Sequence, residues 1–228
     1  MIFLRALLMP LLVAGAAPAA ASSLDRITQA EAVQGLKTAL EQGARAAVKT
    51  LGRTDGFLKD KRVRIPLPES LQRSEKLMRQ VGAGRYADEL IVTMNRAAEA
   101  AVPQAQAVFV DAVKKMSVQD AKKILAGGNT AGTEYFRRAT RSDLRKRFLP
   151  IVKRATAKVK LAQAYQQYAG QAASFGLVKK DQADLDAYVT NEALDGLYFM
   201  VAEEEKKIRK DPVGTGKAIL KKVFGALR

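Results

Sequence analysis

From Leu24 almost to Arg228, apolar and small residues recur every three to four positions, and this spacing constrains the fold more than any other feature. It places apolar side chains on one face of an α-helix, whereas a half-buried strand alternates every second residue. The only alternating stretch is the short RVRIPL, residues 62–67. The sequence therefore predicts an all-α protein, and the lack of an internal repeat or low-complexity linker favours a single multi-helix bundle.

Glycine, proline and capping residues divide this pattern into helices. Gly52 is expected to end the first helix, Ser117 and Asp120 to form a capping box, and Ser142 to start a helix that continues past Pro150. The expected helices cover residues 25–51, 69–81, 85–102, 104–116, 118–126, a short segment from 130, 142–160, 161–173, 184–210 and 215–227. In the second and third of these, the inward side chains are expected to be Leu71, Leu77, Met78, Val81, Tyr86, Leu90, Met94, Ala98 and Ala101.

The stretch LGRTDGFLKDKRVRIPLPESL, residues 51–71, interrupts the helices with two glycines and two prolines. Residues 54–56, Thr-Asp-Gly, predict a turn in which the glycine takes a positive φ, and each proline holds the preceding residue extended. We expect this crossover, near residues 52–68, to lie across the bundle as a structural belt. The alternative is a loop that edges a pocket, with Asp55 and Phe57 as candidate ligand contacts.

The first 21 residues, MIFLRALLMPLLVAGAAPAAA, fit a secretory signal peptide. Arg5 supplies the positive charge, a short apolar run follows, and Ala19-x-Ala21 predicts cleavage before Ser22. The apolar run is too short to span a bilayer, and no later stretch is long enough for a transmembrane helix. We expect a periplasmic protein whose single all-helical domain spans residues 22–228.

The chain contains no histidine and no cysteine. Zinc sites, Ser-His-Asp triads and Cys-His dyads therefore cannot be built, and neither a metal nor another cofactor is expected. Any catalysis would depend on carboxylates with Tyr or Lys. The formal charge is +16 and becomes +15 when Arg5 leaves with the signal peptide. This balance favours anionic partners, which outside the cytoplasm include phospholipid head groups and lipopolysaccharide.

Two helices carry polar residues beside their apolar faces. In the helix over 85–102, Asp88, Asn95 and Glu99 fall on one line, and Arg96 points further outward. These side chains are candidates for ligand binding or for a boundary hydrogen-bond network. In the helix over 184–210, the apolar segment 196–202 indicates a buried central helix, and Glu204 is expected on its inner side with Glu205 outside. The candidate partners for Glu204 are Arg96, Arg137, Arg138 and Lys207, and Tyr135 is a further candidate ligand contact.

The segment from Arg137 to Lys160 holds ten basic residues and one acid, a net charge of +9 over 24 residues. It keeps one apolar face, and such basic amphipathic helices suit an anionic membrane surface, although a solvated outer face of a bundle has the same pattern. The candidate contacts to an anionic surface are Arg145, Lys146, Lys153 and Arg154. No ladder of aromatic residues accompanies the cations, so nucleic-acid binding is not expected.

Several phrases together resemble a bacterial family of exported, all-helical proteins catalogued only as a domain of unknown function. They are LGRTDGF with RIPLPESL, MNRAAEAAVPQA with FVDAVKKMSVQDAKKIL, TEYFRRAT, YVTNEALDGLYFMVAEEEKKIR and the closing LKKVFG. They extend from about Gly35 to Gly225. The resemblance implies export and an all-α fold, and it transfers no catalytic residue.

The sequence leaves three functions open. The first is a non-enzymatic envelope protein that binds an apolar or anionic ligand or partner. The second is an enzyme that uses carboxylates with Tyr or Lys, for example Glu99 and Glu204 near Tyr135. The third is a structural or assembly partner. The lack of His and Cys favours the first and third, and two carboxylates that converge in an open cleft would favour the second.

Overall fold

The computed structural model describes residues 28–166, 184–212, 214 and 217–225. The expected signal peptide and the second half of the helix expected over 161–173 lie outside these ranges. Within them the chain is helical and contains no strand, so the all-α prediction is confirmed. The helices are α1 (Gln29–Leu51), α2 (Glu69–Gln80), α3 (Gly84–Ala101), the 3₁₀ turn η2 (Val102–Gln104), α4 (Ala105–Lys115), α5 (Val118–Ala126), α6 (Ala131–Thr156), α9 (Leu185–Lys210) and α10 (Ala218–Gly225).

Side-chain caps begin several of these helices. The Ser117 hydroxyl accepts the Asp120 N–H at 3.0 Å, and the Asp120 carboxylate accepts the Ser117 N–H at 3.2 Å, which confirms the predicted capping box. Thr28 and Glu31 make the same arrangement at the start of α1. Asp184 accepts a backbone N–H in the first turn of α9. Each cap satisfies donors that a helix start otherwise leaves unpaired.

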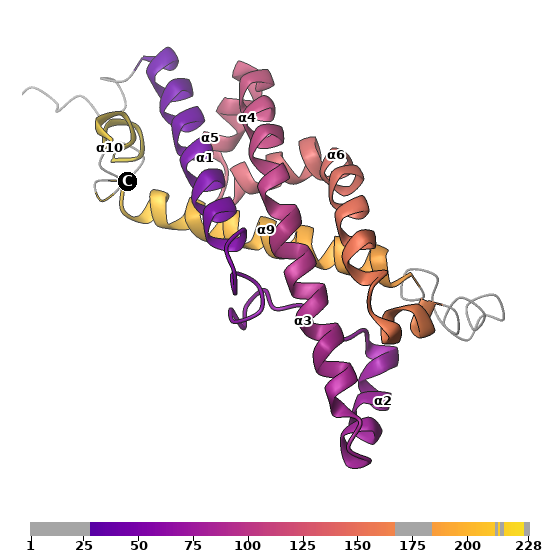
Figure 1. Ribbon diagram of the computed structural model, residues 1–228. Helices are drawn as coiled ribbons and strands as arrows, with labels where there is room; N and C mark the ends of the chain where they lie inside the picture. Colours follow the sequence, from indigo (N-terminus) through magenta and orange to yellow (C-terminus); the bar gives the residue numbers. More distant parts are fainter. Residues whose placement is uncertain (1–27, 167–183, 213, 215–216, 226–228) are drawn as a thin grey trace, which may run out of the picture.

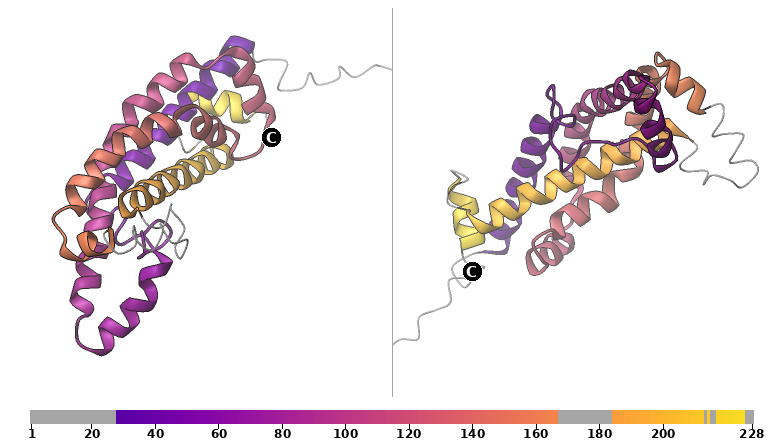
Figure 2. Two further views of the ribbon diagram at one scale, coloured as in Figure 1. Left: turned by 90° about the vertical axis from the view of Figure 1, so that its right-hand side faces the viewer. Right: turned by 90° about the horizontal axis from the view of Figure 1, so that it is seen from below.

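The helix α9 crosses one face of a layer formed by α1, α3, α4 and α6 (Figures 1 and 2). Its side chains at Leu194, Leu197, Tyr198 and Val201 are at most 1% exposed, as the apolar segment predicts for a central helix. Phe199 is the exception at 38% exposed, so this segment is not covered on every side.

The helix α6 is continuous, and the predicted helix start at Ser142 is wrong. One stripe of this helix is buried at four-residue spacing and continues past Ser142; its residues are Phe136, Thr140, Leu144, Phe148 and Val152. Ser142 and Pro150 lie on the exposed side of the helix. Packing against α3 and α9 therefore keeps α6 in one piece despite two residues that disfavour a helix interior.

Together, α2 and residues 84–92 of α3 form a helical hairpin, here called the arm, that protrudes from the bundle (Figures 1 and 2). Leu77, Val81 and Tyr86 are 65%, 79% and 39% exposed, so the expectation that they point inward is wrong. The reason is that α2 packs mainly against α3, and no other described helix forms a layer over the outer side of the arm.

The buried apolar residues of the bundle form one continuous cluster, which makes the described chain a single domain. The cluster reaches α10, where Leu220, Val223 and Phe224 are buried and α10 packs on α1. Gly35 permits this close approach, because a Cβ at that position would lie 2.6 Å from Val223 Cγ2. The chain outside the helices joins the same core, and the crossover over residues 52–68 does so most extensively.

Candidate functional site

The crossover over residues 52–68, here called the belt, begins with a tight turn after α1. Asp55 adopts the left-handed conformation, with φ of 66°, whereas the sequence predicted a positive φ at Gly56. Gly56 is needed for a different reason, because a Cβ there would lie 2.5 Å from the carbonyl oxygen of Leu51. Asp tolerates the left-handed region better than most residues, which explains how the turn forms.

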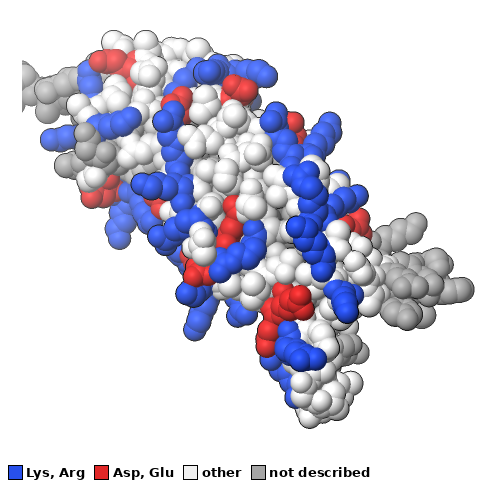
Figure 3. All heavy atoms as spheres, viewed as in Figure 1, with Lys and Arg blue, Asp and Glu red and all other residues white. Residues whose placement is uncertain are grey.

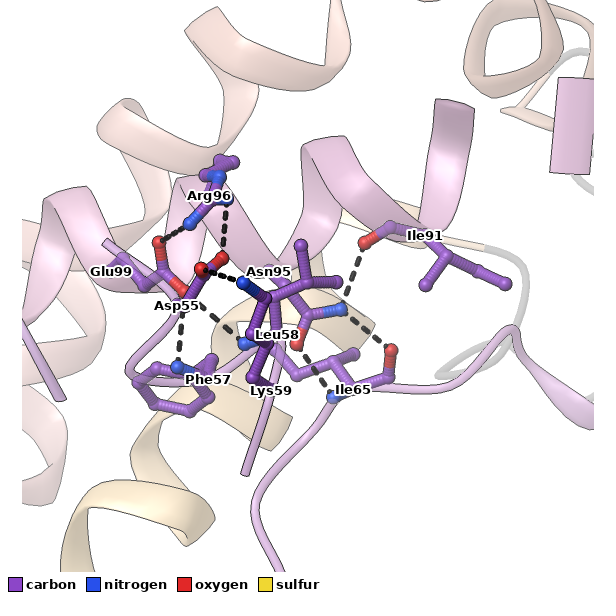
Figure 4. Close-up of polar contacts among 9 residues, drawn as sticks. All are labelled: Asp55, Phe57, Leu58, Lys59, Ile65, Ile91, Asn95, Arg96 and Glu99. Atoms are coloured by element: carbon purple, nitrogen blue, oxygen red, sulfur yellow. Dashed lines mark hydrogen bonds and ion pairs between the residues drawn. The ribbon is translucent and has the colours of Figure 1, made fainter. Parts of the chain in front are cut away.

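Glu99 and Arg96 of α3 hold this turn (Figure 4). Glu99 Oε1 accepts the backbone N–H groups of Phe57 at 3.0 Å and Leu58 at 3.1 Å. Its other oxygen accepts from the Arg96 guanidinium at 2.6 Å, and Arg96 also donates to Asp55 at 2.6 Å. Lys59 and Arg96 donate hydrogen bonds to the Asp55 carboxylate, and these hold its pKa below the usual value. The buried carboxylate of Glu99 is therefore fully partnered.

Asn95 holds the extended half of the belt. Its Oδ1 accepts the Ile65 N–H and its Nδ2 donates to the Ile65 carbonyl, both at 2.9 Å, so the amide pairs with Ile65 as a neighbouring strand would. Nδ2 also donates to the Ile91 carbonyl at 2.8 Å. On the other side of the belt, the Tyr188 hydroxyl of α9 donates to the Pro66 carbonyl at 3.1 Å. Burial raises the pKa of Tyr188, which keeps this donor protonated. We call Asn95, Arg96 and Glu99 the lock.

The belt fills the space between α3 and α9 with apolar side chains. Phe57 and Ile65 are fully buried, and Val63 and Leu67 are nearly so. Gly196 of α9 makes room for them, because a Cβ there would lie 2.8 Å from Phe57 Cε1. These contacts therefore support a structural role for the belt.

The lock brings together Asp55, Phe57, Asn95, Arg96 and Glu99, five of the candidate ligand-binding residues. Their polar groups are bonded to the belt and to one another, so their contacts hold the fold.

The remaining candidates lie elsewhere and do not converge. Asp88 pairs with Arg79 in the arm, and the Tyr135 hydroxyl donates to the Ala112 carbonyl at 2.8 Å. Arg138 is exposed. Glu204 pairs with Lys207 at 2.6 Å. The carboxylate–tyrosine grouping that an enzyme would need is therefore not formed by these residues.

The buried glutamate of α9 is Glu205, not Glu204. Glu205 is 7% exposed and accepts from the backbone N–H groups of Gly132 and Thr133 and from the Thr133 hydroxyl, at 2.8 to 3.0 Å. Arg209 completes its contacts at 3.0 Å. The prediction that Glu204 points inward was wrong. Val201, Glu205 and Ile208 lie on one face of α9, and this face is buried. This carboxylate caps the N-terminus of α6.

An open groove of about 790 Å³ lies between the outer side of the belt and the arm. Sequence reasoning did not find it. The alternating pattern of the belt sequence could have indicated it. Val63, Ile65 and Leu67 are buried, whereas Arg64 and Pro66 between them are exposed. The groove is lined by Lys61, Arg64, Pro66, Leu67, Gln72, Glu75, Lys76, Arg79 and Ile91.

Four cations and one carboxylate line the groove, and the cations differ in their partners. Arg79 is held by Glu75 and Asp88. Its hydrogen bonds, with a weaker contribution from Arg64, hold the pKa of Asp88 below the usual value. Lys61, Arg64 and Lys76 form no ion pair with any residue that the structure describes. The groove therefore presents unpaired positive charge beside an apolar floor.

A family model described as "Protein of unknown function (DUF4197)" matches residues 26–225. The chain belongs to this family. The resemblance to a catalogued domain of unknown function is thereby confirmed. Comparisons with curated proteins and with solved structures gave no significant match.

The basic segment of this DUF4197 chain is partly neutralised. Arg137 and Arg141 pair with Asp195 of α9, and Arg147 pairs with Asp143. Figure 3 shows Lys and Arg spread over the face in view, with Asp and Glu between them. The four candidate surface contacts are exposed and form no ion pair with any described residue; they are Arg145, Lys146, Lys153 and Arg154.

Between α1, α9 and α10 lies a cavity of only about 10 Å³, which has room for about one water molecule. It is not a tunnel for an apolar ligand. Among the residues that the structure describes, no cluster of three acidic side chains is arranged to hold a metal ion. In the same ranges, none of the helices has the length and apolar character needed to cross a membrane.

Proposed function

We propose that this chain is an exported protein of the cell envelope that binds an anionic, partly apolar component without transforming it. The observation that carries the proposal is the groove, where Lys61, Arg64 and Lys76 face open space beside Pro66, Leu67 and Ile91. A phosphate or carboxylate head group would lie among the cations, and an acyl chain would lie on the apolar floor. Anionic phospholipid and lipopolysaccharide share this chemistry.

Export is supported by the sequence of residues 1–21, with its charged start, short apolar run and Ala19-x-Ala21. N-terminal analysis of protein from the periplasmic fraction should begin at Ser22. An intact Met1 would contradict export through a cleaved signal peptide.

A binding role is favoured over catalysis by the way in which the carboxylates are used. Glu99 and Glu205, the two buried glutamates, accept backbone N–H groups and pair with arginine, so neither is open to a substrate. The chain also contains no His, the side chain that most often acts as a general base near neutral pH.

The test measures binding of short-chain phosphatidylglycerol, below its micelle concentration, to the mature protein. The triple variant Lys61→Gln, Arg64→Gln, Lys76→Gln removes three exposed cations, each contributing about 0.5–1 kcal/mol, so binding should weaken roughly tenfold to a hundredfold. The control variant Arg145→Gln, Lys153→Gln, Arg154→Gln changes the same charge on α6 and should bind as wild type. Equal binding by the groove variant and wild type would contradict the proposal.

Two further arms separate the sources of the anion. Short-chain phosphatidylcholine should bind more weakly than phosphatidylglycerol, and soluble lipopolysaccharide fragments should compete only if their phosphate groups enter the groove. Native mass spectrometry of protein purified from its own periplasm would show a carried ligand as added mass.

A second candidate is an anionic membrane surface bound by α6, favoured by the exposed and unpaired Arg145, Lys146, Lys153 and Arg154. Each cation near such a surface contributes on the order of 1 kcal/mol. Replacing all four by Gln should then weaken vesicle binding by about two orders of magnitude while leaving helicity unchanged. Higher salt should weaken binding as well, because the screening length falls.

A further inference from the structure

The end of the arm carries the two most exposed large apolar side chains of the described chain. Leu77 and Val81 are 65% and 79% exposed, and Tyr86 beside them is 39% exposed. All three lie around the turn that joins α2 to α3. This turn is the outermost point of the protruding arm (Figures 1 and 2). Figure 3 shows the end of the arm as largely uncharged, with Lys and Arg along one side.

Two backbone donors of this turn are bonded within it, whereas no side chain caps the start of α3. The Ala83 N–H donates to the Met78 carbonyl at 2.7 Å, and the Gly82 N–H donates to the Arg79 carbonyl at 3.3 Å. With Gly82 at a φ of 76°, these two bonds form a Schellman motif that closes α2. Residues 80–84 carry no charge. The tip can therefore enter a medium of low polarity without leaving these N–H groups unpaired.

The charges around the tip match an anionic surface. Lys76 and Arg85 form no ion pair with any described residue, whereas Arg79 is neutralised by Glu75 and Asp88. Arg85 lies 4.8 Å from the centre of the Tyr86 ring and donates to its hydroxyl at 2.9 Å. Tyr is enriched at the boundary between lipid and water, and long basic side chains reach from there to anionic head groups.

We propose that the tip of the arm inserts into the interface of an anionic bilayer, with Leu77 and Val81 among the acyl chains and Lys76 and Arg85 at the head groups. An anionic bilayer would contact both the exposed apolar side chains and the flanking cations. The tip is also convex and stands clear of the bundle, so a planar surface reaches it without steric conflict. The proposal does not depend on ligand binding in the groove.

The chain contains no tryptophan, so one introduced tryptophan reports on its own position. Val81→Trp places it at the tip, and Val118→Trp places it at a residue that is 48% exposed at the start of α5. With phosphatidylglycerol vesicles, the emission of the tip variant should shift to shorter wavelength and be quenched by brominated acyl chains. The α5 variant should show neither effect, and neutral phosphatidylcholine vesicles should have little effect on either variant.

A second measurement compares vesicle co-sedimentation. Leu77→Asp with Val81→Asp should lower binding to phosphatidylglycerol vesicles by about tenfold or more, because two apolar contacts are lost and two like charges are added. Val118→Asp should leave binding unchanged. Both changes are on exposed side chains, so thermal unfolding should remain that of wild type.

Two results would overturn the proposal. Vesicle binding without a shift in the Val81→Trp emission would show that another surface, such as α6, carries the contact. A shift that appears without vesicles and grows with protein concentration would show that the tip docks on a second copy of the chain. The Val81→Trp variant keeps Lys61, Arg64 and Lys76, so failure of the groove to bind soluble lipid would leave the tryptophan result unchanged.

Discussion

The two ends of α3 differ in how they use their side chains. Its C-terminal half lies in the bundle, where Asn95 and Glu99 are buried and the polar groups of the lock are bonded to the belt and to one another. Its N-terminal half lies in the arm, where Tyr86 and Val92 are exposed beside unpaired cations. The comparison shows that a cluster of polar residues can use its hydrogen bonds to hold the fold and leave none for a ligand. Binding is better sought where charges and apolar groups lack partners.

The largest effect is expected at Glu205, which resembles the lock in its burial and its partners. Glu205→Ala would remove the carboxylate partner of Arg209, which keeps its bond to the Ile124 carbonyl, and would leave the N–H groups of Gly132 and Thr133 without their acceptor in the core. The free energy of unfolding should fall by about 4 kcal/mol. Its neighbour gives the control, because Glu204 makes only a surface pair with Lys207, and Glu204→Ala should cost about 0.5 kcal/mol or less. Equal changes in chemical denaturation would contradict this assignment.

The lock itself should be nearly as sensitive. Glu99→Ala removes the acceptor of two belt N–H groups and leaves Arg96 with Asp55 as its remaining carboxylate partner, so we expect a loss of about 3 kcal/mol. In the arm, Asp88→Ala breaks an exposed pair with Arg79 and should cost about 0.5 kcal/mol or less. Comparable losses for the two variants would remove the distinction between the two ends of α3.

The apolar side of the belt should tolerate added volume poorly. Gly196→Ala places a methyl group 2.8 Å from Phe57 Cε1 and 3.3 Å from Val63 Cβ, and the resulting shift should cost about 2 kcal/mol. Gly128→Ala is the matched control, because nothing lies within 4 Å of its added Cβ. Thermal unfolding of the two variants measures the difference. A Gly196→Ala protein as stable as wild type would show that the belt packs loosely on α9.

The smallest effect is expected from titration of Asp55. Lys59 and Arg96 lower its pKa in the folded protein, so its contribution to stability is present above the unfolded pKa of about 4 and is lost as the pH falls through the folded value. Asp55→Asn should therefore reduce the loss of stability between pH 5 and pH 2. Denaturation curves over this range measure it. Identical pH dependence in the two proteins would contradict the pairing with Arg96.

The periodic spacing predicted the helices well where one face is buried along the whole element. The predicted capping box also located the start of α5. The pattern failed where tertiary contacts decide. Leu77 and Val81 have a helical spacing, but no neighbouring layer covers them. Ser142 can begin a helix, but the buried stripe of α6 continues past it.

The candidate site was predicted in part for the same reason. Asn95 and Glu99 were found because they border the apolar face of α3, but the spacing does not show that their partners are backbone groups of the belt. Glu204 and Glu205 are separated by only 100° on a helix, so the sequence did not decide which one meets α6. The groove cations lie in two separate segments, and only the fold places Lys61 and Lys76 together.

Amide hydrogen exchange, with and without phosphatidylglycerol vesicles, tests the contrast between the belt and the arm in one measurement. The account predicts that the amides of Phe57, Leu58 and Ile65 exchange slowly in both conditions, because the lock holds them. Amides of residues 69–92 should exchange faster, and those around the turn at 77–86 should gain protection only when anionic vesicles are present. A belt that exchanges as fast as the arm, or protection that appears on α6 and not at the turn, would contradict the account.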